Sequence, residues 1–235
     1  MGDEEAVSVE AVLKELRSHR NPANVKGMAR FGISSKNTLG ISVPTLRGMA
    51  KKLGRDHALA LALWDSGIHE ARILAPMVDE PAVVTEAQME RWVRGFDSWD
   101  ICDQCCSNLF DSTRFAYAKA VEWAMRDPEF VKRAGYVMMA ALAVHDKKAN
   151  DEEFVSFLRL IEKGATDERN FVEKAVNWAL RQIGKRNANL NKEALEVAKR
   201  ISKLDSGAAK WVASDAIREL RSEAVQKRLK RSSGA

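Results

Sequence analysis

FVKRAGYVMMAAL (residues 130–142) recurs in modified form as FVEKAVNWALRQI (residues 171–183) and again as AAKWVASDAIREL (residues 208–220). In each stretch a basic residue is followed by Ala or Trp, and these basic positions, Arg133, Lys174 and Lys210, are 41 and 36 residues apart. All three stretches carry apolar residues at the spacing of one helical face. The chain is therefore predicted to contain tandem helical units of about 40 residues.

Helical spacing extends over nearly the whole chain, and start signals such as Asp127-Pro128-Glu129 precede several segments. The predicted helices span Val9–Leu16, Thr45–Leu53, and about 56–64, 68–78, 86–95, 98–110, 112–126, 128–145, 151–163, 168–185, 191–203, 207–221 and 223–230. No segment alternates apolar and polar residues for long enough to predict a strand. The expected fold class is all-α.

Two-helix units with a period near 40 are typical of HEAT-like repeats, which stack into a curved α-solenoid with a concave groove. Equivalent positions in successive repeats point the same way, so Arg133, Lys174 and Lys210 are expected to form a basic stripe. An ordinary helical bundle with chance similarity is the alternative. Because no linker or low-complexity run divides the chain, a single domain over residues 1–235 is expected.

The composition limits the class of protein. The 235 residues are 46% hydrophobic and 30% charged, and no run of about 18 apolar residues predicts a transmembrane helix. The acidic start at residues 1–5 differs from a secretory signal, which begins with basic residues. These features predict a cytoplasmic protein without a membrane partner.

Three cysteines, Cys102, Cys105 and Cys106, lie within five residues. Such a group cannot form a disulfide framework, and a zinc site would need further Cys or His ligands at a regular spacing, which the sequence lacks. Buried structural thiols are the favoured interpretation. No metal and no cofactor are expected.

Positive charge is concentrated towards the C-terminus. Residues 169–235 hold 16 Lys and Arg against 7 Asp and Glu, a net charge of +9, whereas the first 168 residues carry −4. Nucleic acid is the commonest partner of such an asymmetry, although basic helical faces can also be merely solvated. The tail from about 224 to 235 is expected to be partly disordered. A concave groove with regularly spaced cations suits duplex DNA, bound by shape and charge without sequence readout.

Trp99 and Asp103 form the most informative local pattern. Residues four apart share one helical face, so the indole is expected beside the carboxylate. An aromatic wall next to a negative charge can bind a cation or stabilise a positive charge that develops in a transition state. A buried Trp beside a solvated Asp is the alternative.

Five segments together resemble the AlkD-type DNA alkylation repair glycosylases, a family built of HEAT-like repeats. The resemblance runs from about residue 28 to about residue 187. Its carrying segments are Met28-Ala29-Arg30-Phe31, Leu63-Trp64-Asp65, Ser98-Trp99-Asp100-Ile101-Cys102-Asp103, Val131-Lys132-Arg133-Ala134 and Lys174-Ala175-Val176-Asn177-Trp178-Ala179-Leu180-Arg181.

The resemblance implies a monofunctional hydrolase of N-glycosidic bonds. Its substrates would be cationic N3-alkyladenine and N7-alkylguanine in double-stranded DNA, and the base would not enter a protein pocket, unlike the flipped bases of most glycosylases. Trp99 and Trp178 would lie against the lesion's deoxyribose, with Asp103 as the catalytic carboxylate.

The resemblance also implies DNA contacts. Arg133 would grip the backbone near the lesion, and Lys147 and Lys148 match phosphate contacts only loosely. Lys174 and Arg181 flank Trp178 on its predicted helix and are further candidate contacts. An inter-helix ion pair is the alternative for Arg133.

Some residues depart from the family pattern. Phe31 replaces a Tyr of relatives, and Ser98 stands where some relatives have a second Trp. The remaining indoles are expected to pack in the core or between repeats: Trp64, Trp92, Trp123 and Trp211.

Two other functions stay open. One is a non-catalytic binder of branched or distorted DNA on the same scaffold, and the other is a protein–protein scaffold. No lysine matches the site, which argues against lyase chemistry through a Schiff base. A monomer is expected.

Overall fold

The computed structural model describes residues 7–232, and within this range every regular element is a helix. The predicted all-α class is therefore confirmed. The chain divides into two compact units between Thr113 and Arg114. One domain over residues 1–235 remains a prediction, as do the curvature of the solenoid and its groove.

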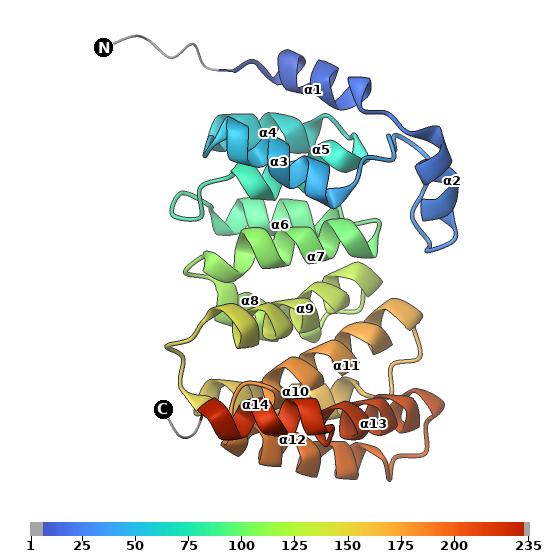
Figure 1. The fold of residues 1–235 in the computed structure, drawn as a ribbon, viewed down its shortest axis with the longest axis vertical. Coiled ribbons are helices and arrows are strands. Elements are labelled where there is room, and N and C mark those ends of the chain that lie inside the picture. Colours follow the sequence, from blue (N-terminus) through green and yellow to red (C-terminus); the bar gives the residue numbers. More distant parts are fainter. Residues whose placement is uncertain (1–6, 233–235) are drawn as a thin grey trace. The chain divides into compact units, whose positions relative to one another are not determined.

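The first unit contains seven α-helices and a short 3-10 helix (Figure 1). These are α1 (Val9–Ser18), α2 (Pro22–Ala29), α3 (Val43–Leu53), α4 (His57–Asp65), α5 (His69–Val78), α6 (Glu86–Arg94), α7 (Trp99–Asn108) and η1 (Phe110–Ser112). Helix α5 lies at the centre, because it packs against α3, α4 and α7. Stacked indoles of Trp64 and Trp92, with ring centroids 4.4 Å apart, fill the core between α4 and α6.

The second unit contains the other seven helices. These are α8 (Ala116–Ala124), α9 (Glu129–His145), α10 (Asp151–Gly164), α11 (Asn170–Gly184), α12 (Ala188–Ile201), α13 (Gly207–Leu220) and α14 (Glu223–Ser232). Helices α9, α11 and α13 lie side by side in chain order, and each packs on a helix of the series α8, α10 and α12. The repeated stretches found in the sequence are thus the helices of one layer, as the 40-residue period predicts.

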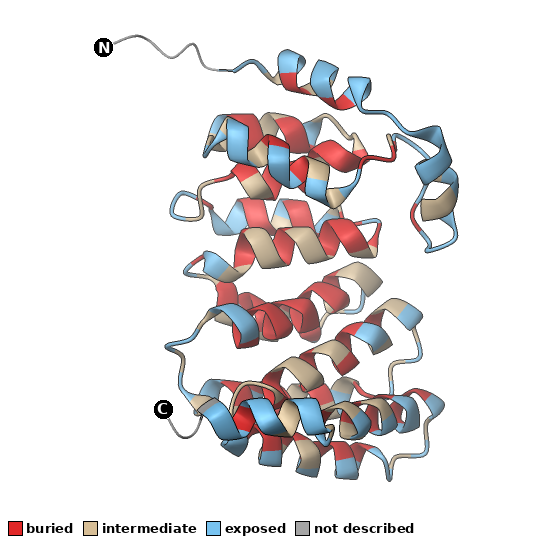
Figure 2. Cartoon of the chain, in the orientation of Figure 1, coloured by how far each residue is buried: buried red, intermediate tan, exposed pale blue. Residues whose placement is uncertain are grey.

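Equivalent residues of successive repeats meet in this layer. Phe130 opens α9 and Phe171 opens α11, and their ring centroids are 5.4 Å apart. Helix α9 is buried over most of its length, whereas α11 and α13 also carry exposed residues (Figure 2). The repeat therefore exists in three dimensions, because the same sequence position packs against its own copy.

Two segments differ from the sequence-based expectation. Helix α2 was not predicted, because none of its residues is buried and it lacks an apolar face; Asn21 caps it and Pro22 begins it. The segment expected to be helical from 112 begins at Ala116, after η1 and a turn.

The basic tail is ordered up to Ser232, as α14. Leu229 is buried, the Gln226 side chain donates to the Leu220 carbonyl at 2.7 Å, and Arg228 donates to the Lys185 carbonyl at 2.7 Å. These contacts hold α14 in the second unit, and the partial disorder expected for the tail stays a prediction. Residues 233–235 lie outside the described range.

Gly135 allows α9 to cross α8 closely. A Cβ at this position would lie 2.2 Å from the Ala124 nitrogen and 2.7 Å from its Cα. We therefore expect Gly135→Ala to lower the free energy of unfolding by about 1–3 kcal/mol, because backbone atoms must move apart. Urea denaturation followed by circular dichroism measures this change.

Gly48→Ala is the matched control, since a Cβ on Gly48 of α3 meets nothing within 4 Å. It should raise stability by about 0.5–1 kcal/mol through helix propensity. Equal effects of the two substitutions would contradict the close crossing.

Candidate functional site

Helix α7 carries the first half of the candidate site. Trp99 is its first residue and Asp103 lies one turn later on the same face, as the spacing predicts. Both residues are half-buried. The indole and the carboxylate are thus both partly accessible on one face of α7.

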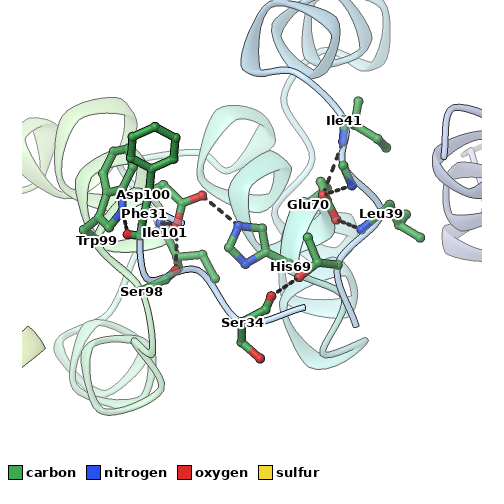
Figure 3. A network of polar contacts seen from close by, with 12 residues as sticks. Phe31, Ser34, Leu39, Ile41, His69, Glu70, Ser98, Trp99, Asp100 and Ile101 are labelled. Atoms are coloured by element: carbon green, nitrogen blue, oxygen red, sulfur yellow. Dashed lines mark hydrogen bonds and ion pairs between the residues drawn. The ribbon is translucent and has the colours of Figure 1, made fainter. Parts of the chain in front are cut away.

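The indole of Trp99 is held by a specific hydrogen bond. Its Nε1–H donates to the backbone carbonyl of Phe31 at 3.0 Å (Figure 3). Phe31 follows α2, and its own side chain is 68% exposed. The carbonyl fixes the ring orientation of Trp99 without requiring the tyrosine hydroxyl that relatives carry at position 31.

A cavity of about 440 Å³ opens beside Trp99. It is lined from α2, α3, α5 and α7, mostly by apolar side chains. Asp100 and Gln104 contribute the polar groups from α7, whereas Asp103 is not among the lining residues. The carboxylates of α7 therefore have different surroundings, and Asp100 belongs to the interior.

Asp100 forms a buried network at the start of α7 (Figure 3). One carboxylate oxygen pairs with His69 Nε2 at 2.7 Å, and the other accepts from Ser98 Oγ at 2.7 Å and from the Ile101 amide at 3.0 Å. Sequence analysis did not connect Asp100 with His69. No local pattern links these residues, which are 31 positions apart.

The hydrogen-bonded network shifts the pKa values of both His69 and Asp100. Burial opposes the charged forms, but the hydrogen bond and the mutual charge of the pair outweigh it. The pKa of His69 is raised from its ordinary value of 6.5, and the pKa of Asp100 is lowered from 3.8. Each partner therefore favours the charged form of the other.

Glu70, the next residue of α5, fixes the loop that follows Phe31. Its fully buried carboxylate accepts the backbone N–H groups of Leu39 at 2.8 Å, Gly40 at 2.6 Å and Ile41 at 3.3 Å. Gly40 has a φ of 83°, and a Cβ there would lie 2.2 Å from the Asn21 carbonyl oxygen. Adjacent residues of α5 thus hold both the start of α7 and the loop beside it.

The second unit carries the other predicted residues. Trp178 is half-buried on α11, and Lys174 is exposed one turn before it. Within the described chain no carboxylate lies within ion-pair distance of the Lys174 ammonium. Trp178 belongs to the second unit, and its role at the lesion remains part of the proposal below.

Arg181 is engaged in ion pairs between neighbouring helices. Its guanidinium pairs with Glu219 and lies 3.6 Å from an oxygen of Asp215, both on α13. Lys185 shares Glu219 at 2.6 Å. The charge of Arg181 is therefore already compensated, whereas that of Lys174 is not.

Arg133 is buried on α9. Its Nη1 donates to the Phe171 carbonyl at 2.6 Å, at the first turn of α11. The side chain thus links neighbouring repeats. The sequence-based alternative was an inter-helix ion pair, and here the inter-helix partner is a backbone carbonyl.

Lys147 and Lys148 are exposed in the loop between α9 and α10. Lys147 lines an open cavity of about 630 Å³ together with Arg186 and Arg228. Asp151, the one carboxylate in the lining, accepts amide hydrogens from Asn187 and Asn189. The cavity therefore presents an excess of positive charge.

The interpretation of the cysteines is confirmed. Cys102, Cys105 and Cys106 are free and buried, and burial raises the pKa of the Cys105 and Cys106 thiols.

Over residues 7–232, no cluster of three His, Cys, Asp or Glu residues is arranged to hold a metal ion. In the same range, no helix combines the length and hydropathy needed to span a membrane.

The indoles divide differently from the sequence-based expectation. Trp64, Trp92 and Trp123 are buried, as predicted for packing residues, but Trp211 is 43% exposed. The prediction for Trp211 was wrong because it rested on the apolar pattern of its stretch. Within that pattern Trp211 falls on the solvent side of α13.

The buried pair makes stability depend on pH. A raised His69 pKa stabilises the fold below about 6.5 and loses this effect as the pH rises through the folded-state value, whereas a lowered Asp100 pKa stabilises it above about 3.8. His69→Leu should therefore cost roughly 3 kcal/mol in urea unfolding at pH 5.5 and clearly less at pH 9.

His19→Leu is the control, since His19 is exposed and makes no side-chain contact with a carboxylate in the described structure. It should unfold like the wild type at both pH values. A loss for His69→Leu that is the same at pH 5.5 and pH 9 would show that the ion pair does not stabilise the fold.

Comparison with known proteins identifies the family. A family model described as "DNA alkylation repair enzyme" matches residues 12–220. Uncharacterised proteins of Listeria monocytogenes and Listeria innocua are each 22% identical over 195 residues, covering 81% of this chain and 84% of theirs. A solved structure is described as from "a new family of proteins related to the HEAT-like repeat DNA glycosylases with affinity for branched DNA structures". It matches with a TM-score of 0.76 at 19% identity, covering 90% of this chain and 95% of that one. This likeness confirms the HEAT-like repeat fold, and the chain belongs to the DNA alkylation repair enzyme family.

Proposed function

We propose that this protein is a monofunctional alkylpurine DNA glycosylase. It hydrolyses the N-glycosidic bond of N3-alkyladenine and N7-alkylguanine in duplex DNA, without inserting the base into a pocket. The observation that carries the proposal is the position of Trp99 and Asp103 on one face of α7, with the indole held by the Phe31 carbonyl, in a member of this repair family.

The charge of the lesion makes the chemistry simple. An alkylated purine is already cationic, so it leaves as a neutral base with the electrons of the glycosidic bond and needs no general acid. The sugar becomes oxocarbenium-like and is attacked by water at C1′. A carboxylate close to C1′ stabilises that cation and accepts the proton of the attacking water. Asp103 is the residue proposed for this role.

Two indoles are proposed to enclose the sugar. Trp99 and Trp178 exclude water from its other sides, and each adds a cation–π attraction of about 0.5–2 kcal/mol as positive charge develops. Because this attraction grows towards the transition state, it raises the rate more than it strengthens ground-state binding.

DNA backbone binding is assigned to the cations of the second unit. Lys174 is exposed without an ion pair, and Lys147 borders a cavity with two arginines. Lys148, Arg181 and Arg133 complete the proposed set. The last two have protein partners and contribute less to phosphate neutralisation. The protein is proposed to act as a monomer on alkylated duplex DNA, in the cytoplasm, without metal or cofactor.

A non-catalytic role is the second candidate. The solved structure with the same fold comes from a family described as having affinity for branched DNA, which supports a DNA-structure binder. Retention of both indoles and Asp103 in this chain favours catalysis over that role.

Release of free base tests the proposal. Wild-type protein incubated with methylated duplex DNA should release 7-methylguanine without strand cleavage, detected by chromatography. Asp103→Asn should lower the single-turnover rate by about 10²–10³-fold, because the carboxylate charge acts mainly in the transition state.

Asp97→Asn is the matched control, since Asp97 is exposed just before α7 and should retain the wild-type rate. Absence of base release by wild-type protein that still binds DNA would overturn the glycosylase proposal and leave the binding role.

Salt dependence tests the backbone contacts. Lys174→Ala should reduce the slope of log K against log salt by about 0.9, since one phosphate contact is lost. Lys192→Ala makes the same charge change on α12, where an exposed lysine lies in the other helical layer, and should leave the slope unchanged. Equal slopes for both variants would show that Lys174 contacts no phosphate.

A further inference from the structure

An exposed indole on α13 is not explained by the proposed lesion site. Trp211 is 43% exposed, whereas Trp64 is 4% exposed and Trp92 and Trp123 are fully buried. A large aromatic ring left in water forgoes the hydrophobic stabilisation that burial would give. Its exposure makes the ring available to a partner.

Helix α13 has one packed side and one open side. Ala209, Val212, Ala213 and Ala216 are buried on the packed side. Trp211, Ser214 and Arg218 are exposed and spaced three and four residues apart, so they form a single stripe on the open side. We call these three residues the α13 stripe.

The α13 stripe borders the exposed face of α11. Asn177 of α11 donates to the Val212 carbonyl at 3.2 Å, and Arg181 lies 3.6 Å from Asp215, so the two helices are direct neighbours. Both also pack on α12. Their open faces therefore lie on the same side of the second unit, and Trp178 and Lys174 lie on that side.

Basic side chains flank the exposed ring. Lys210 precedes Trp211 and is 61% exposed, and Arg218 is 75% exposed two turns later. Lys210 lies 3.5 Å from the fully exposed Asp205, and Arg218 pairs with Asp215. The Lys210–Asp205 pair is exposed and contributes little stability, so a phosphate can replace that carboxylate. Asp215 also lies beside Arg181, so the mostly exposed guanidinium of Arg218 can bind a phosphate while Asp215 keeps a cationic neighbour.

We propose that the α13 stripe, with Lys210, is a second DNA-contact surface, on which Trp211 packs against a deoxyribose of the duplex beyond the lesion. Lys210 and Arg218 bind the phosphates on either side of that sugar. The inference rests on the proposed DNA-repair function and extends it with a contact that does not touch the lesion.

Duplex DNA is the occupant that the charges favour. A protein partner would match an apolar ring with an apolar patch, whereas here the ring lies among cations at helical spacing. Aromatic contact with a nucleotide combined with flanking Lys and Arg is a sequence-tolerant mode of nucleic-acid binding. The sequence around Trp211 contains no element for reading base edges, so the contact is expected to be independent of sequence.

DNA affinity tests the contact of Trp211 with the sugar, and the salt dependence of that affinity tests the phosphate contacts of Lys210 and Arg218. Trp211→Ala should weaken binding of duplex DNA by about 10-fold, equally for methylated and unmethylated duplexes, with the salt slope unchanged because no phosphate contact is lost. Lys210→Ala and Arg218→Ala should each reduce the slope by about 0.9. Fluorescence anisotropy of a labelled duplex over a salt series gives both quantities.

Controls keep the result decisive. Met125→Ala removes another large exposed apolar side chain of the second unit and should bind DNA like the wild type. Trp211→Phe should retain most of the affinity, and circular dichroism confirms that each variant is folded. Absence of base release by the wild type would remove the glycosylase proposal but would leave the binding loss of Trp211→Ala in place.

Two outcomes would overturn the inference. Unchanged affinity of folded Trp211→Ala would show that the ring does not contact DNA. A wild-type dimer that Trp211→Ala converts to a monomer in sedimentation experiments, with DNA affinity preserved, would assign the stripe to self-association.

Discussion

The hydrogen-bonded ion pair of His69 and Asp100 determines where α7 begins. It is buried, it joins α5 to α7, and Asp100 uses its remaining oxygen on Ser98 and the Ile101 amide. The direction of the first turn of α7 sets the position of Trp99 and, one turn on, of Asp103. Glu70 fixes the loop after Phe31 by accepting backbone N–H groups, and the Phe31 carbonyl in turn accepts the hydrogen bond of the Trp99 indole. Two consecutive residues of α5 thus orient an exposed site that neither of them reaches.

The charged groups of the chain have distinct roles. Asp100 is paired internally, while Asp103 is partly accessible on α7 and is proposed to stabilise the developing sugar cation. In the second unit, Arg181 and Lys185 are balanced by Glu219, while Lys174 is not. An unpaired surface cation attracts phosphate at long range, whereas a compensated one mainly joins helices. Excess positive charge in residues 169–235 therefore does not imply that every cation binds DNA.

The sequence predicted the helical layers well and individual exposures less well. The stretches that became α9, α11 and α13 were recognised because a core-facing helix must repeat its apolar residues with the helical period. Helix α2 has no buried residue and hence no such pattern.

Contacts between distant residues were not predicted. Buried Arg133 donates to the Phe171 carbonyl, 38 residues away, and the His69–Asp100 pair spans 31 residues. Trp211 was assigned to packing because its neighbours are apolar, although the helical phase turns its ring to solvent. Contacts over such separations arise from tertiary packing and leave no local signal.

The central claim is that Trp99 and Asp103 stabilise a positively charged sugar. The most direct measurement compares the affinity for duplex DNA containing a cationic pyrrolidine in place of one deoxyribose with that for DNA containing a neutral tetrahydrofuran. If these two residues stabilise the cation, the cationic analogue should bind about 100-fold more tightly, as expected for a transition-state mimic, and Asp103→Asn should remove most of this preference. Equal affinity of wild-type protein for the two analogues would show that Trp99 and Asp103 do not stabilise a sugar cation.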